Sequence, residues 1–145
     1  HWLAGTNDRA FSLPALMTSY AAVPTSKSLA VKVRLAHAHG KVSEEASEVA
    51  TWADFHLRGI PLPRPVRAEL CFTRDDARDW TERRWETTPA KLVGGKPVAD
   101  IPPDATAHYF NTFAANGFVD STPIRTRMDG GSGRGDLSDT HLSVK

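Results

Sequence analysis

The chain has 145 residues, 40% of them hydrophobic, and its 18 Lys and Arg residues nearly balance 17 Asp and Glu residues, for a formal net charge of +1. That length holds one ordinary domain or two small ones. Because the basic residues are scattered among the acidic ones, the composition does not predict a nucleic-acid partner. No apolar run approaches the ~20 residues of a membrane span, so no membrane partner is expected either.

Cys71 is the only cysteine, which excludes a disulfide within the chain. Its place among Glu69, Leu70 and Phe72 is typical of a small buried hydrophobic residue. The first residues show no signal peptide, and a chain that opens at His1 inside a strand looks truncated. The compartment is therefore left open by the sequence.

The first half of the chain predicts strands that alternate with helices. A short strand from Trp2 ends before Asp8, and Ser12 with Pro14 in the first turn predicts a helix. The alternating residues 29–35 predict a second strand. Ser43 is the expected N-cap of a second helix that runs to about Arg58, before Gly59 and Pro61 stop it.

The second half has the period of β-structure. Three prolines at every second position make 60–65 a stiff extended linker. Residues 66–127 alternate between turn signals and predict a small antiparallel sandwich with a turn at Asn116-Gly117. Its aromatic residues are expected mainly to fill the core. The tail, 128–145, has too few apolar groups to offset the entropy of ordering. The chain thus divides into 1–59, 60–65, 66–127 and 128–145.

An acid and two histidines follow the two predicted strands of the first half. Asp8 comes just after the first strand, and His37 and His39 come just after the second. The carboxyl ends of parallel strands meet at one edge of a sheet, so the carboxylate and an imidazole can meet there. An Asp that orients a His is two thirds of a Ser-His-Asp triad, with the imidazole free to take a proton from a nucleophile. Taken alone, Asn7-Asp8 and the histidines also fit ordinary turns and loops.

Three stretches resemble a known family. Gly5-Thr6-Asn7-Asp8, His37-Ala38-His39-Gly40 and residues 52–59 look like the C-terminal part of the bacterial α/β-hydrolases grouped with prolyl oligopeptidases and acetylxylan esterases. The resemblance runs from about Trp2 to about Arg127. It implies an α/β fold: a C-terminal fragment of a hydrolase sheet, with about two strands and two helices, followed by a β-sandwich-like module. It favours His39 over His37 as the base, because a small residue, His and Gly after a strand is the usual family setting.

The nucleophile elbow of that family, Gly-x-Ser-x-Gly, has no match upstream of Asp8. We therefore expect a fragment of a serine hydrolase for acyl esters, peptides or acetylated polysaccharides that is inactive alone and has no cofactor or metal. The alternative is a non-catalytic β-rich module that binds a polymer or a partner through 66–127. In either case an exposed strand edge in 1–59 predicts self-association.

Overall fold

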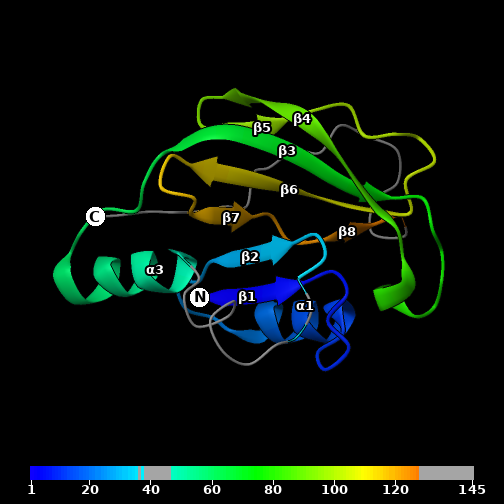
Figure 1. The fold of residues 1–145 in the computed structure, drawn as a ribbon, viewed down its shortest axis with the longest axis horizontal. Coiled ribbons are helices and arrows are strands. Elements are labelled where there is room, and N and C mark those ends of the chain that lie inside the picture. The colour runs from blue at the N-terminus through cyan, green and yellow to red at the C-terminus, as the bar shows by residue number, and fades with distance from the viewer. Residues whose placement is uncertain (36, 38–46, 128–145) are drawn as a thin grey trace.

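The computed structural model describes residues 1–35, 37 and 47–127, and its chain is mostly β. Figure 1 shows a small parallel sheet and the described helices, 13–22 and 47–58, beneath a larger, curled antiparallel sheet. The predicted α/β class is therefore wrong. The described elements, in chain order, are β1 (Trp2–Gly5), α1 (Leu13–Ala22), β2 (Leu29–Lys32), α3 (Ser47–Arg58), β3 (Pro65–Thr73), the 3-10 turn η1 (Trp80–Glu82), β4 (Trp85–Val93), β5 (Lys96–Val98), β6 (Ala107–Ala114), β7 (Val119–Ser121) and β8 (Arg125–Thr126).

The small sheet consists of β1 and β2, which run parallel and are joined by α1. The chain crosses over through α1, which starts after Ser12 and carries Pro14 in its first turn, where a missing N–H costs nothing. Strand β2 ends at Lys32, three residues before the end predicted from its alternation, because Arg34 takes a left-handed turn with φ 59°. The predicted N-cap of the second helix, Ser43, lies outside the described residues.

The large sheet has six strands in the order β5-β4-β3-β6-β7, with β8 beside the start of β6. The neighbouring strands in that order are antiparallel, and Gly117, with φ 87°, makes the turn predicted between β6 and β7. The predicted strands are present, but they form one curled sheet instead of a sandwich. The strand pattern missed the two-residue strand β8 and could not say which strands would share a sheet.

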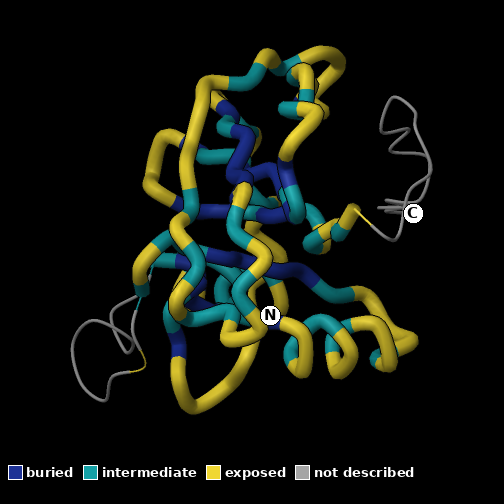
Figure 2. Tube along the Cα trace, turned by 90° about the vertical axis from the view of Figure 1, so that its right-hand side faces the viewer, coloured by how far each residue is buried: buried dark blue, intermediate teal, exposed yellow. Residues whose placement is uncertain are grey.

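The two faces of the large sheet are covered differently. One face, with Cys71 and Tyr109, packs on Leu13, Leu29 and Val31 of the first half of the chain. The other face, with Leu70, Phe72 and Phe110, is covered by the segment around Ala105. Figure 2 shows the buried stretches as separate segments that lie mostly inside the molecule, with exposed residues on its periphery. One face of the large sheet is thus covered by α1 and the small sheet, and the other face by a loop. Neither face is covered by a second antiparallel sheet of the predicted sandwich.

Polar side chains join the small sheet to the large one. The hydroxyl of Ser121 accepts a hydrogen bond from the Val31 N–H at 2.8 Å, and the Asn111 amide donates to the Val31 carbonyl at 3.0 Å. Ser121 in turn donates to Asn111 at 2.5 Å. These bonds satisfy the outer edge of β2, which would otherwise bury unpaired backbone groups. Whether 1–59 and 66–127 fold as separate units stays a prediction.

Candidate functional site

The first candidate site lies where β1 and β2 end. Asp8 Oδ2 and His37 Nδ1 are 3.3 Å apart, and the carboxylate is largely buried while the imidazole is 38% exposed. The other carboxylate oxygen, Oδ1, accepts the backbone N–H groups of Ala10 and Phe11 at 2.8 and 3.1 Å. One oxygen therefore closes the turn that Asn7-Asp8 predicts, and the other faces the histidine.

The segment that carries His37 is fixed against the end of β1. The Thr6 N–H donates to the Lys32 carbonyl at 3.0 Å, and the Thr6 hydroxyl accepts the Arg34 N–H at 3.1 Å. The Phe11 ring lies 5.5 Å from the His37 ring. The other predicted base, His39, lies outside the described residues. Among the predicted catalytic residues, the structure brings Asp8 and His37 together, and their use in catalysis stays a prediction.

The second candidate site is an open groove of about 450 Å³ where the two sheets meet, which we call the junction groove. Its lining comes from the end of β2, from the large sheet and from the turn before β7. Its lining residues are Lys32, Val33, Arg67, Glu69, Thr87, Asn111, Phe113, Gly117 and Val119. Sequence reasoning missed this groove because its residues come from distant strands that only the fold brings together.

The charges in the junction groove are paired and held in place. The Arg67 guanidinium lies 3.5 Å from the centre of the Phe113 ring and forms an ion pair with Glu69. Lys32 Nζ lies 2.9 Å from a carboxylate oxygen of Glu48, which is fully buried on α3. That contact brings the two charges together without hydrogen-bond geometry, since neither Glu48 oxygen has a hydrogen-bond partner among the described residues. The groove therefore presents two cations, each beside a carboxylate, and no strong net charge.

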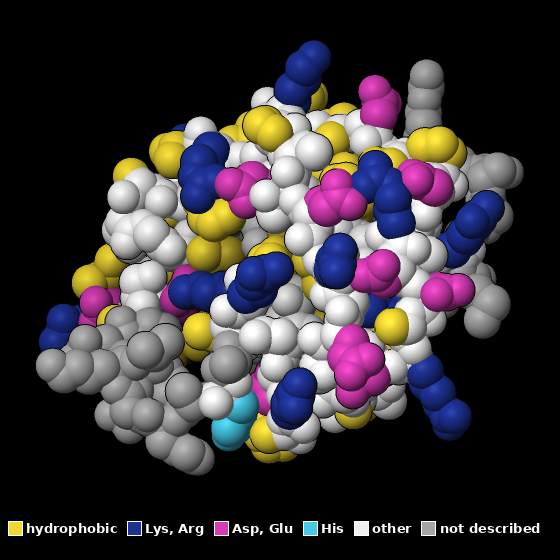
Figure 3. Space-filling view, turned by 45° about the vertical axis from the view of Figure 1, so that its right-hand side comes forward, with side chains coloured by type: hydrophobic (Ala, Val, Ile, Leu, Met, Phe, Trp, Pro, Cys, Tyr) yellow, Lys and Arg dark blue, Asp and Glu magenta, His cyan; other side chains and the backbone are white. Residues whose placement is uncertain are grey.

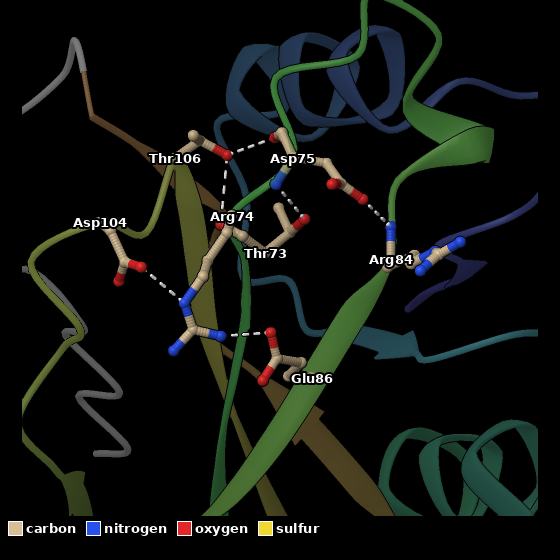
Figure 4. Close-up of polar contacts among 7 residues, drawn as sticks. All are labelled: Thr73, Arg74, Asp75, Arg84, Glu86, Asp104 and Thr106. Carbon is tan, nitrogen blue, oxygen red and sulfur yellow. Dashed lines mark hydrogen bonds and ion pairs between the residues drawn. The ribbon is translucent and has the colours of Figure 1, made fainter.

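A third polar cluster lies at the far end of the large sheet and is structural. Figure 4 shows Arg74 between Glu86 on β4 and Asp104 in the loop before β6; its Nε donates to Asp104 at 2.8 Å. The Thr106 hydroxyl donates to the carbonyls of Thr73 and Asp75. The ion pairs are exposed, so they hold the loop beside β4 but contribute little to the free energy of unfolding.

The remaining titratable groups do not assemble a reactive centre in the part of the chain that is described. Burial raises the pKa of the Cys71 thiol to about 12, so Cys71 is the inert, buried residue that the sequence predicts. Burial and the Arg125 charge lower the pKa of His108. The described residues contain no group of three or more His, Cys, Asp or Glu side chains placed to hold a metal ion. None of the described helices is long and apolar enough to span a bilayer.

Comparison with known proteins assigns no identity to this fold. No family model, no curated protein and no solved structure matches the chain. The function is therefore inferred from the geometry of the two sites.

Proposed function

We propose that this chain is a non-catalytic β-rich binding module whose partner is a protein that docks on the junction groove. The observation that supports this proposal is the Arg67 side chain, which is 55% exposed and lies over the Phe113 ring in the lining of that groove. Arg, with Trp and Tyr, is among the side chains most enriched in the residues that dominate protein–protein binding energy. Because Arg67 is held by Phe113 and Glu69, little rotamer freedom is lost on binding.

The shape and charge of the junction groove favour a protein over other ligands. Small-molecule sites bury most of their ligand in a closed cleft, whereas this groove is open along the sheet. Its cations are matched by Glu69 and Glu48, so it lacks the unbalanced positive stripe that a phosphate backbone needs. Figure 3 shows that charges of both signs are also interspersed on the face it displays.

Peptide selection tests the proposal without a known partner. Random peptides displayed on phage are selected against the whole chain, and one synthetic binder is titrated into the ¹⁵N-labelled protein. We expect shift changes at residues 67–69 and 111–113, and about tenfold or greater weakening in Arg67→Ala, because a central Arg in an interface contributes more than ~1.4 kcal/mol. Arg78→Ala, which removes an exposed cation outside the groove, is the matched control. Binders that map elsewhere and ignore Arg67 would contradict the proposal.

A second function is favoured by the contact between Asp8 and His37. We propose that Asp8 is the orienting acid and His37 the base of an acyl hydrolase whose nucleophile is supplied by another polypeptide segment. The 3.3 Å separation is within hydrogen-bond reach, and the exposed ring is accessible to a substrate. The test of this hydrolase role combines the chain with a polypeptide that supplies a Gly-x-Ser-x-Gly elbow. Hydrolysis of an activated acetyl ester is then measured. Activity that is unchanged by Asp8→Asn would reject this second function.

A further inference from the structure

Strand β4 is paired on its outer side along only part of its length. On its inner side, residues 85–90 pair with β3, and on its outer side β5 pairs only with residues 91–93. No described strand lies beside the outer edge of 85–90. The side chains from Glu86 to Pro89 are all exposed, so this edge is open to solvent. An open strand edge is a template for pairing with another chain.

The backbone groups that face outward follow from the hydrogen bonds of the neighbouring strands. The Phe110 N–H donates to the Thr122 hydroxyl and the Phe110 carbonyl accepts the Thr122 N–H, so both groups of Phe110 point away from β3. Leu70, directly opposite Phe110, must then turn its own groups toward Thr88 on β4. The directions of the backbone N–H and C=O groups alternate along a strand. The groups that point away from β3, toward the open edge of β4, are therefore those of Trp85, Thr87 and Pro89.

The prolines agree with this assignment. Pro89 lacks an N–H, and because its backbone faces outward, no hydrogen bond between β3 and β4 is lost there. Pro97 on β5 lies opposite Leu92, at a position where the alternation requires no bond from either residue. The open edge therefore offers N–H groups from Trp85 and Thr87 and carbonyl groups from Trp85, Thr87 and Pro89.

We infer that β4 pairs with β4 of a second copy of this chain in a two-fold symmetric, antiparallel dimer centred on Thr87. In that register, Thr87 of each copy donates its N–H to the Thr87 carbonyl of the other. The Trp85 N–H meets the Pro89 carbonyl of the partner copy, and the same bond recurs on the other side of the axis. The N–H that Pro89 lacks falls opposite the Trp85 carbonyl, so both outward donors of each copy find an acceptor.

The charges and the ends of the edge fit the same register. Glu86 is the only charged residue in 85–90, and Arg74 neutralises it (Figure 4). It faces Thr88 of the partner copy, so no like charges meet. At one end the pairing with β5 begins at Lys91, which lies opposite Val98. At the other end the chain leaves the strand at Arg84, whose N–H donates to Asp75. The open edge at 85–90 of one copy is therefore long enough to pair with the same residues of the second copy.

The dimer goes beyond the proposed binding function and does not depend on it. A two-fold axis through the pair of Thr87 residues is perpendicular to the sheet, so equivalent faces of both copies lie on the same side. Thr87 also lines the junction groove, so the two grooves lie side by side across the axis. A partner with two matching segments would gain avidity from this arrangement.

Sedimentation equilibrium and amide exchange on the full chain test the dimer. We expect concentration-dependent dimerisation, with slowed exchange of the Thr87 amide at high concentration only. Thr87→Lys places like charges directly opposite each other across the axis and should weaken the dimer roughly tenfold or more. Thr88→Lys, on the opposite face and beside Glu86 of the partner copy, is the matched control and should dimerise at least as well as the wild type.

A cysteine variant provides a positive signal that does not depend on losing the dimer. Cα atoms of directly opposed, hydrogen-bonded residues lie ~5.5 Å apart, within the range that a disulfide spans. Oxidised Thr87→Cys should therefore form a covalent dimer, while Cys71, which is fully buried, does not. A wild-type chain that stays monomeric, or a dimer that Thr87→Lys leaves unchanged, would overturn the inference.

Discussion

A Cβ atom on Gly5 would lie 1.5 Å from the carbonyl oxygen of Leu35, so the end of β1 and the segment after β2 can approach each other only through a glycine. The approach is between backbones, which have no flexible side chain to move aside. Leu35 lies two residues before His37, so this contact helps to hold the imidazole near Asp8. The spacing of Asp8 and His37 therefore depends on a residue that touches neither side chain.

We predict that Gly5→Ala destabilises the fold by about 1–3 kcal/mol, because the added methyl group must push Leu35 away. It should also move the ring-proton resonances of His37, since the nearby Phe11 ring shifts them. Gly94→Ala, whose Cβ would meet nothing within 4 Å, is the matched control for a glycine substitution, although its φ of 58° carries a backbone cost of its own. Equal effects of the two variants on His37 would contradict this prediction.

How far the sequence predicts this fold depends on the distance over which the determinants act. The turn at Asn116-Gly117, the helix that starts near Pro14 and the burial of Cys71 all follow from local residue preferences, and they are present. The predicted sandwich failed because the alternation of residues in a strand specifies which residues share a face, and the partner strand is chosen by contacts distant in sequence.

The two candidate sites differ in how far local sequence predicts them, for the same reason. Asp8 and His37 follow the ends of strands that are adjacent in sequence, so the parallel pairing of β1 and β2 is enough to bring them together. The junction groove combines Lys32, Arg67 and Phe113, which are separated by dozens of residues and by the turn of the sheet. No local spacing marks these residues as neighbours. The end of β2 was misplaced because its alternation continues into a turn that Thr6 and Arg34 impose.

We predict that Asp120 makes the stability of the chain depend on pH below neutrality. Burial raises its pKa from 3.8 to about 6, although backbone N–H groups of Leu29 and Ser121 oppose the rise. The folded chain therefore favours the protonated acid. The associated stabilisation is complete below pH ~4 and is lost as the pH rises to ~6, with a ceiling of about 3 kcal/mol at 1.36 kcal/mol per pKa unit. Partial exposure of the residue reduces that figure.

Asp120→Asn tests this dependence, because the amide oxygen keeps an acceptor for the backbone while the charge is removed. Urea unfolding at pH 4 and pH 7.5 should show that the variant gains stability relative to the wild type at the higher pH. Asp79→Asn is a control of opposite sign, since hydrogen bonds from Thr81 lower the pKa of Asp79 and so favour its charged form. A variant of Asp120 that loses stability at pH 7.5 would show that the carboxylate bonds outweigh desolvation.

We predict that Ser121→Ala weakens the attachment of the small sheet to the large one by about 1–3 kcal/mol. The substitution leaves the buried Val31 N–H without its acceptor and Asn111 without its donor, and an unsatisfied buried group carries that cost. Thr18→Ala, which removes an exposed hydroxyl bound to Pro14, should change stability by less than about 0.5 kcal/mol. Urea midpoints measure both, and native-state exchange should show the amides of β2 opening first in Ser121→Ala.

We predict that the 145-residue chain by itself does not catalyse acyl transfer. An Asp–His pair can accept a proton, but acyl transfer also needs a nucleophile and donors that stabilise the oxyanion. The seven residues before Asp8 contain no Gly-x-Ser-x-Gly elbow, which provides these groups in α/β-hydrolases. We therefore expect the 145-residue chain to hydrolyse p-nitrophenyl acetate no faster than a mixture of its amino acids containing the same number of histidines. Asp8→Asn should leave that background rate unchanged, because free imidazole reacts without an orienting carboxylate. A rate well above the background that falls in both Asp8→Asn and His37→Ala would show that the pair is already part of a working active site and would reject the non-catalytic proposal.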